Sequence, residues 1–226
     1  MDGVFMDFAQ PHDFDAIFEF MQNHFRIIEP ITTALNSSYS DTFQFYKDIV
    51  SGDLKVPFAS LIARNGNREV IGVALNTIYD YDDLNQNKMD TNQREFGNLI
   101  DQGPYDNRNA NRLAVFIDFV ENGLFKFVSP WAKIFKFDIL AVRSDQAGKG
   151  LGSYFINSSM DLARRHQCTH IATCATAQAS QRLFSKRGFK TIREVAFDDF
   201  KDQDVAVYNS VFDKGKSAKL MLLPLL

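Results

Sequence analysis

The spacing of hydrophobic residues along the chain predicts a mixed domain of helices and strands. Apolar residues recur at helical spacing between Phe14 and Ile28, and the predicted helix ends at Glu29-Pro30, because a residue before proline is pushed out of the helical region. The same spacing predicts helices over residues 41–50, 113–127, 155–166 and 179–187. Apolar runs predict strands over residues 4–9, 58–63, 70–75, 137–142, 169–174 and 189–195, with one or two closing strands within 205–211 and 219–226.

The order of these elements predicts an α/β fold, with a mixed sheet that carries helices on both faces. Asn65-Gly66 lies between the second and third strands, and this dipeptide favours a tight turn that makes them an antiparallel pair. The chain has 226 residues and neither an internal repeat nor a linker, so we expect a single domain over residues 1–226. The stretch 79–112 is rich in acids and amides, which predicts a surface loop with a short helical piece, either a plain connection or a lid.

Composition narrows the function classes. The net charge of −3 argues against nucleic acid as the main partner, because that role needs a concentrated basic face. Cys168 and Cys174 form no metal-ligand spacing with each other or with the four scattered histidines, so we expect reduced core cysteines and no metal. No window approaches the roughly 20 apolar residues of a membrane helix, so no membrane association and a cytoplasmic location are expected. Oligomeric state stays open between monomer and homodimer.

A glycine-rich turn follows the predicted strand 137–142 and leads into a helix. Gly148, Gly150 and Gly152 let backbone N–H groups approach a ligand without a Cβ in the way, and the helix adds its positive dipole end. The turn lacks the Gly-Lys-Ser/Thr of nucleotide hydrolases and the G-x-G-x-x-G of dinucleotide-binding folds. We therefore predict a cradle for a phosphorylated ligand that is neither a nucleoside triphosphate nor a nicotinamide cofactor.

Several motifs together resemble the GNAT superfamily of acetyl-coenzyme A-dependent N-acetyltransferases. They are the strand end Leu140-Ala-Val142, the turn Gly148-x-Gly150-x-Gly152, the strand that ends near Cys174, and the segment 179–189. The resemblance implies a central mixed, mostly antiparallel sheet and acetyl-CoA as co-substrate. It places the cofactor on Leu140, Ala141, Val142, Ala147, Gly148, Lys149, Gly150, Leu151, Gly152 and Ser180.

Phe25-x-x-x-Glu29-Pro30, Thr176 and Ser180 look most like the invertebrate arylalkylamine N-acetyltransferases. That resemblance implies a catalytic set of Glu29, Thr176 and Ser180, with Glu29 as the general base that deprotonates the amine. From the residues alone, Glu29 could equally be a solvated carboxylate at a turn. The two hydroxyls could relay protons or hold the amine, but they could also cap the following helix.

Two positions depart from the superfamily pattern. Ala147 stands where the turn usually carries Gln or Arg, and Phe184 stands where many members have a tyrosine that protonates the leaving thiolate. A nucleophilic role for Cys174 is disfavoured, because no histidine is adjacent in sequence and direct transfer needs none.

The expected substrate is a small-molecule primary amine. An arylalkylamine is favoured over a polyamine, because the helix before Glu29 is aromatic and no acidic cluster is apparent in the sequence. The alternatives are a polyamine or protein acceptor, or a coenzyme A-binding protein with impaired catalysis.

Overall fold

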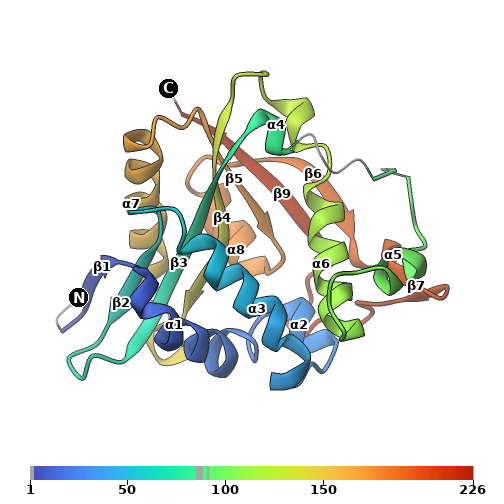
Figure 1. Cartoon of the computed structure of the whole chain (residues 1–226), viewed down its shortest axis with the longest axis horizontal. Coiled ribbons are helices and arrows are strands. Elements are labelled where there is room, and N and C mark those ends of the chain that lie inside the picture. The colour runs from blue at the N-terminus through green and yellow to red at the C-terminus, as the bar shows by residue number, and fades with distance from the viewer. Residues whose placement is uncertain (1–2, 85–88, 91, 226) are drawn as a thin grey trace.

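A seven-stranded sheet forms the centre of the computed structural model, which describes residues 3–84, 89–90 and 92–225 (Figure 1). Its strands are β1 (Phe5–Phe8), β2 (Leu61–Arg64), β3 (Val70–Asp80), β4 (Lys133–Val142), β5 (His170–Ala175), β6 (Lys190–Ala196) and β9 (Ser217–Pro224). They lie in the order β1-β2-β3-β4-β5-β9-β6. Only β4 and β5 pair in parallel, so the predicted mixed, mostly antiparallel sheet is confirmed.

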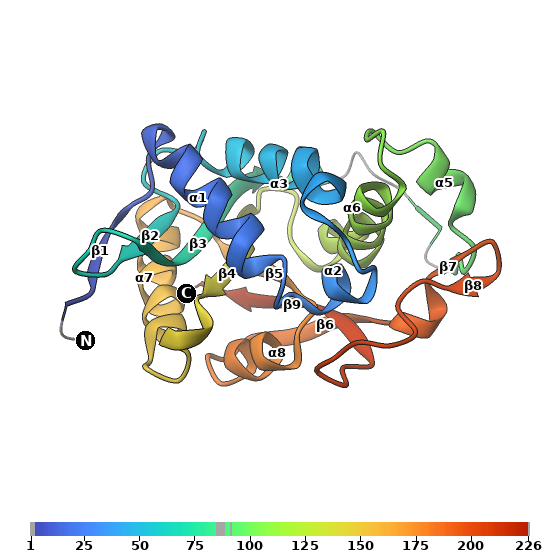
Figure 2. The ribbon, with the colours of Figure 1, turned by 90° about the horizontal axis from the view of Figure 1, so that it is seen from below.

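Helices cover both faces of the sheet, as the hydrophobic pattern predicts (Figure 2). They are α1 (Phe14–Phe20), α2 (Pro30–Ala34), α3 (Tyr39–Asp53), α4 (Tyr81–Leu84), α5 (Gly97–Asp101), α6 (Arg108–Glu121), α7 (Leu151–Arg165) and α8 (Gln178–Ser185). One buried apolar cluster joins α1, α3 and α6 to one face of the sheet, and a second joins α7 and α8 to the other.

Several predicted boundaries differ from the structure. The helix expected over 14–28 is α1 followed by one π-helical turn, Met21–Phe25, and it ends before Glu29 as Pro30 requires. The closing strand expected over 205–211 is wrong beyond residue 206: β7 (Lys201–Asp202) and β8 (Val205–Ala206) make a small separate hairpin. The chain then turns inward because Tyr208 is buried among core aromatics. The last predicted strand is confirmed as β9.

The stretch 79–112 is more ordered than a loop. It continues β3 to Asp80, adds α4 and α5, and begins α6 five residues earlier than predicted, although residues 85–88 and 91 lie outside the described part. Arg108 and Arg112 each place a guanidinium nitrogen 2.6 Å from the carboxylate of Asp202, whose side chain is 2% exposed. These ion pairs join the start of α6 to the β7–β8 hairpin.

An irregularity in β4 shapes the middle of the sheet. The β3 neighbours Leu75 and Asn76 pair with Ile139 and Phe137, which leaves Asp138 as an extra residue in β4. Such a bulge bends a strand and re-aims its side chains. Pairing between β4 and β5 ends at Phe137 with Thr173, so the rest of β4 has no partner on that side.

Candidate active site

The glycine turn has the geometry of an anion cradle. Gly148 and Gly150 adopt left-handed φ values of 76° and 86°, and a Cβ at either would meet nothing within 4 Å. The N–H groups of Gly148, Lys149 and Gly150 donate no hydrogen bond to any described residue. Gly150 is also the N-cap of α7, whose first-turn amides have no side-chain cap. Helix dipole and free amides therefore point at one exposed place.

The unpaired part of β4 leads directly to this turn. The amide of Arg143 donates to the Ile71 carbonyl of β3, and amides alternate in direction along a strand. The amides of Leu140 and Val142 therefore face the side on which β5 has separated. These groups are free to hydrogen-bond an extended ligand, or an oxyanion that develops beside the strand.

Glu29 is buried at the start of α2 and held by four donors. Its carboxylate accepts hydrogen bonds from the Ile31 amide at 3.3 Å, the Thr32 amide at 2.6 Å, the Thr32 hydroxyl at 2.6 Å and the Thr176 hydroxyl at 2.8 Å. The Thr32 hydroxyl lies 3.0 Å from Tyr46 Oη. Burial raises the pKa of Glu29 above the ordinary glutamate value, and the hydrogen bonds of Thr32, Thr176 and Ile31 offset part of that rise.

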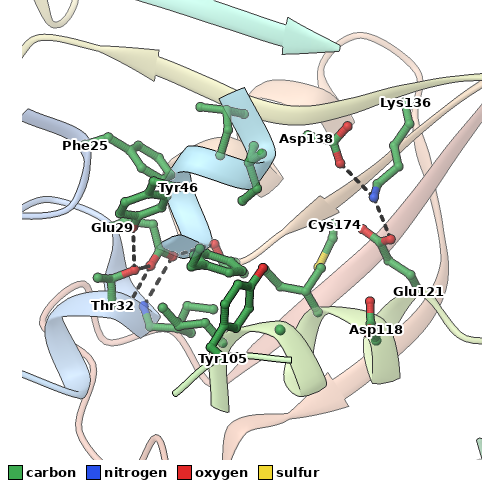
Figure 3. A pocket seen from close by; sticks show the side chains of 18 of the residues that line it. Phe25, Glu29, Thr32, Tyr46, Tyr105, Asp118, Glu121, Lys136, Asp138 and Cys174 are labelled. Carbon is green, nitrogen blue, oxygen red and sulfur yellow. Dashed lines mark hydrogen bonds and ion pairs between the residues drawn. The ribbon is translucent and has the colours of Figure 1, made fainter. Parts of the chain in front are cut away.

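A cavity of about 290 Å³ lies beside Glu29, between the sheet and helices α3 and α6 (Figure 3). Its wall near Glu29 is aromatic and aliphatic, and its lining includes Phe25, Ile31, Phe45, Tyr46, Ile49, Tyr105, Leu113, Ile117 and Ile139. Cys174 and Thr176 line the same cavity from β5 and the residues just after it. A largely apolar chamber with a few polar groups at its wall is typical of a small-ligand site.

The other end of the cavity is charged. Lys136 Nζ, on a side chain that is 10% exposed, lies 2.6 Å from Glu121 Oε2 and 2.7 Å from Asp138 Oδ1. Asp118 lines the cavity one helical turn before Glu121. Burial alone would lower the pKa of Lys136, but the adjacent carboxylates of Asp138 and Glu121 raise it well above the ordinary lysine value. Burial raises the pKa of Glu121 to about 7, against the opposing effect of Lys136.

Comparisons with known proteins agree with this geometry. Residues 105–189 match the family model described as Acetyltransferase (GNAT) family. Arylalkylamine N-acetyltransferase 2 from Aedes aegypti is similar at a TM-score of 0.77 and 22% identity, covering 100% of both chains. A Drosophila melanogaster polyamine N-acetyltransferase has a TM-score of 0.74 and 14% identity, covering 98% of this chain and 100% of its own. Arabidopsis thaliana NAA60 in complex with acetyl-CoA has a TM-score of 0.54 and 13% identity, covering 98% of this chain and 99% of its own. No curated protein matches the sequence.

The chain has the GNAT fold. The family model covers α6, β4, the glycine turn, α7, β5 and α8, so it spans both the cradle and the charged end of the cavity. The predicted resemblance to the GNAT superfamily is confirmed for the fold and for the segment that matches the family model. The free amides of the cradle and of β4 can hydrogen-bond the phosphate and amide groups of an extended ligand.

All the predicted cofactor residues except Ser180 lie between the end of β4 and the first turn of α7. Leu140, Ala141 and Val142 end β4, and Gly148, Lys149 and Gly150 are exposed in the turn. Ala147 is exposed too, and its amide already donates a hydrogen bond to the Ser144 carbonyl. Leu151 and Gly152 begin α7, where Leu151 is 3% exposed and belongs to the core beneath the turn. Leu151 can therefore contribute through its backbone only.

The three predicted catalytic residues are not all together. Thr176 contacts Glu29 directly, which the sequence could not show across 147 positions. Ser180 lies in the first turn of α8, where its hydroxyl donates to the Ala177 carbonyl at 2.8 Å. Ala177 is the N-cap of α8, so the Ser180 hydroxyl neither donates to Glu29 nor has the expected capping role. Phe184 is 1% exposed and packs edge-on against Phe137 at 5.2 Å between ring centroids, so it is a core residue. Cys174 lines the cavity, and burial raises the pKa of its thiol well above the ordinary value.

Sequence reasoning missed the charged end of the cavity and Tyr46. The signal for the charged end was present: Lys136 and Asp138 interrupt the apolar run 134–142, and Asp118 and Glu121 are one turn apart in the apolar half of α6. Within the described ranges, 3–84, 89–90 and 92–225, no group of histidine, cysteine or acidic residues has metal-binding geometry. Across the same ranges no helix combines the length and the apolar character needed to cross a membrane.

Proposed function

We propose that the protein transfers the acetyl group of acetyl-CoA to the primary amine of a small molecule, with Glu29 as the general base. The observation that carries the proposal is the buried Glu29 carboxylate, hydrogen-bonded to Thr176, at the wall of a cavity that a small amine can fill. The glycine turn lies at the end of β4, the strand that also supplies Lys136, Asp138 and Ile139 to this cavity.

Deprotonation is the first demand of the reaction. An alkylamine with a pKa of about 10.4, like that of lysine, arrives as an ammonium ion and cannot attack until it loses a proton. A carboxylate offers about four acceptor sites, and four donors already use those of Glu29. The Thr176 hydroxyl keeps acceptor capacity of its own. It can take the ammonium proton while passing its hydroxyl proton to Glu29 Oε1, which leaves a neutral amine and a protonated Glu29.

Acyl transfer follows from the free amine. Acetyl-CoA supplies a thioester carbonyl: the amine nitrogen bonds to its carbon, the C–S bond breaks, and coenzyme A leaves as a thiolate. The nitrogen loses its second proton as the amide forms, and the thiolate takes up one proton to give the free thiol. The amides of Leu140 and Val142 face the side where the carbonyl oxygen would gain negative charge. A thiolate whose conjugate acid has a pKa of about 8.5 leaves readily, which fits the absence of a tyrosine hydroxyl at Phe184.

Binding of acetyl-CoA is assigned to the cradle and β4. The amides of Gly148, Lys149 and Gly150 and the start of α7 would hold the pyrophosphate, with the Lys149 ammonium adding charge. Backbone donors supply most of this site, so Ala147 in place of a polar side chain removes one contact. The cytoplasm remains the expected location, and monomer or homodimer the expected state.

The acceptor amine is less constrained by the fold. The similar structures are named as arylalkylamine and polyamine N-acetyltransferases, and either class would present a primary amine to Glu29. An arylalkylamine suits the aromatic wall of Phe25, Tyr46 and Tyr105. A polyamine would meet an acidic cluster that is not apparent in the sequence, because Asp118, Glu121 and Asp138 meet at one end of the cavity.

Release of free coenzyme A thiol from acetyl-CoA tests the proposal. Tryptamine, dopamine and spermidine are offered in turn, and turnover of at least one is expected, with the N-acetylated product identified by mass. Thermal stabilisation by acetyl-CoA is measured in parallel. Stabilisation without turnover of any amine would indicate the alternative, a coenzyme A-binding protein without this activity.

A further inference from the structure

The cavity is long enough to hold both ends of an extended amine. Thr176, which contacts Glu29, lies four residues after Ala172, and Ala172 pairs with Lys136 across β4 and β5. At about 3.3 Å per residue, the two ends are roughly 13 Å apart along the sheet. A ligand whose amine reaches Thr176 therefore extends toward the charged end, where the bulge residue Asp138 lies closer than Lys136.

Carboxylates outnumber cations at that end. Asp118, Glu121 and Asp138 line the cavity, and Lys136 is the one basic residue among its described lining. The Lys136 ammonium is shared between Glu121 and Asp138, and no basic group of the described chain forms an ion pair with Asp118. Burial raises the pKa of Glu121 to about 7, so this group is only partly ionised at neutral pH, and Lys136 also balances Asp138. Asp118 is therefore the carboxylate at this end that no resident cation of the described chain neutralises.

Asp53 and Asp138 can partner each other behind this end of the cavity. Asp53 is 4% exposed, and burial together with the neighbouring Asp138 carboxylate raises its pKa well above the ordinary aspartate value, so a protonated Asp53 can donate a hydrogen bond to Asp138. Asp138 also pairs with the Lys136 ammonium. Asp118 is then the lining carboxylate that no described residue supplies with a donor, and an ammonium or guanidinium group offers both positive charge and N–H donors.

The walls between the two ends are apolar. Ile117, Ile139 and the ring of Tyr105 lie along the cavity and match a hydrocarbon spacer, not a second polar group in the middle of a ligand. An anionic substituent at the far end would meet the three carboxylates and be repelled. A neutral alkyl or aryl group at the far end of the ligand would shield the carboxylates from water without giving them a hydrogen-bond partner, which costs free energy.

We propose that the acceptor is an amine with a second cationic group, which Asp118 binds at the far end of the cavity together with Glu121 and Asp138. The inference rests on the proposed function, because it assumes that the reacting amine is at Glu29. It makes Asp118 a specificity-determining residue. Asp118 is more exposed than Glu121 and has no resident partner, so it contributes charge to a ligand at the least desolvation cost.

Matched substrates test the second charge. 1,5-Diaminopentane and pentylamine share one carbon chain and differ only in the distal ammonium, and phenethylamine and tyramine supply an aryl group without and with a hydroxyl. With the wild-type protein, kcat/KM is expected to be at least about tenfold higher for the diamine than for pentylamine. That factor is the size of a charge-assisted hydrogen bond.

Matched variants test the residue. Asp118→Asn keeps the shape and removes the charge, and it should lower kcat/KM for 1,5-diaminopentane about tenfold more than for pentylamine. Asp161→Asn, the same change at an exposed residue of α7, should leave the ratio of the two substrates as in the wild type. Circular dichroism and acetyl-CoA affinity confirm that both variants are folded.

Each other outcome overturns the inference. Equal turnover of the diamine and pentylamine, or a ratio that Asp118→Asn does not change, means that the cluster binds no second cation. A preference for tyramine over the diamine would assign the charged end to a phenolic hydroxyl. Both results would leave the acetyltransferase proposal standing. Silence with every amine in the presence of bound acetyl-CoA would overturn that proposal as well.

Discussion

Replacement of Glu29 by glutamine separates a catalytic carboxylate from a structural one. Glutamine keeps one oxygen, which can still accept from the Thr32 amide and hydroxyl, the two contacts of 2.6 Å. Its NH₂ group would then face the Ile31 amide and the Thr176 hydroxyl. The threonine hydroxyl can rotate to accept this N–H, so the weak 3.3 Å contact from Ile31 is the one that is lost.

The expected effects on stability and rate differ widely in size. Loss of about one hydrogen bond costs roughly 1 kcal/mol of folding free energy, and removal of a buried charge offsets part of it. Loss of a general base lowers the rate about 10²- to 10⁴-fold, which is about 3–5 kcal/mol of transition-state stabilisation. The rotated Thr176 hydroxyl would also no longer donate its proton. Glu29→Gln should therefore be folded and nearly inactive.

The pH dependence of kcat/KM gives the sharpest assay. The carboxylate must be ionised to act as a base, so the wild-type rate should fall as the pH falls through the pKa of Glu29, which burial raises above the ordinary glutamate value. The residual rate of Glu29→Gln should lack this acid limb. Glu19→Gln, the same change at an exposed residue of α1, should keep both rate and limb.

Two outcomes would assign Glu29 a structural role only. If Glu29→Gln binds acetyl-CoA normally and turns over an amine at the wild-type rate, then Glu29 is only the N-cap of α2. A matching loss of thermal stability and activity would lead to the same conclusion, because it would show that the fold and not the chemistry had been damaged.

Three further changes test other parts of the structure. Thr176→Val removes one donor to Glu29, so kcat/KM should fall at least about tenfold. The acid limb of kcat/KM should move to higher pH, because the lost hydrogen bond lowers the pKa of Glu29, and an unmoved limb would contradict the contact. Gly150→Glu places bulk and negative charge at a φ of 86°, and calorimetry should show acetyl-CoA affinity reduced at least about tenfold, whereas unaltered affinity would contradict the cradle. Asp202→Asn leaves Arg108 and Arg112 without their shared carboxylate. Because both arginines are partly exposed, the free energy of unfolding measured in urea should fall by at most about 3 kcal/mol. The arginines lower the pKa of Asp202, so the wild-type contribution should be present above the unfolded pKa and lost only as the pH falls through the lowered value, below the ordinary aspartate range.

Much of the architecture is local and could be predicted from the sequence. The apolar spacing of α1 and α7, the Pro30 that ends the first helix, and the glycines before α7 act through neighbouring residues, and each is where it was expected. The strand predicted over 205–211 is wrong beyond residue 206, because Tyr208 is buried by a turn into the aromatic core and not by sheet pairing.

The candidate site also combines features that local sequence sets with features that depend on tertiary contacts. The sequence alone determined the glycine turn before α7, because such a turn needs no distant partner, and it pointed to Glu29 through its position before Pro30. Only the tertiary structure decided that Thr176 meets Glu29, that the Ser180 hydroxyl donates to the Ala177 carbonyl, and that carboxylates from α6 and β4 meet at one end of a cavity. These contacts join residues that are far apart in the chain. They depend on how far β4 and β5 separate and on where a single bulge turns Asp138, and no local pattern encodes that geometry.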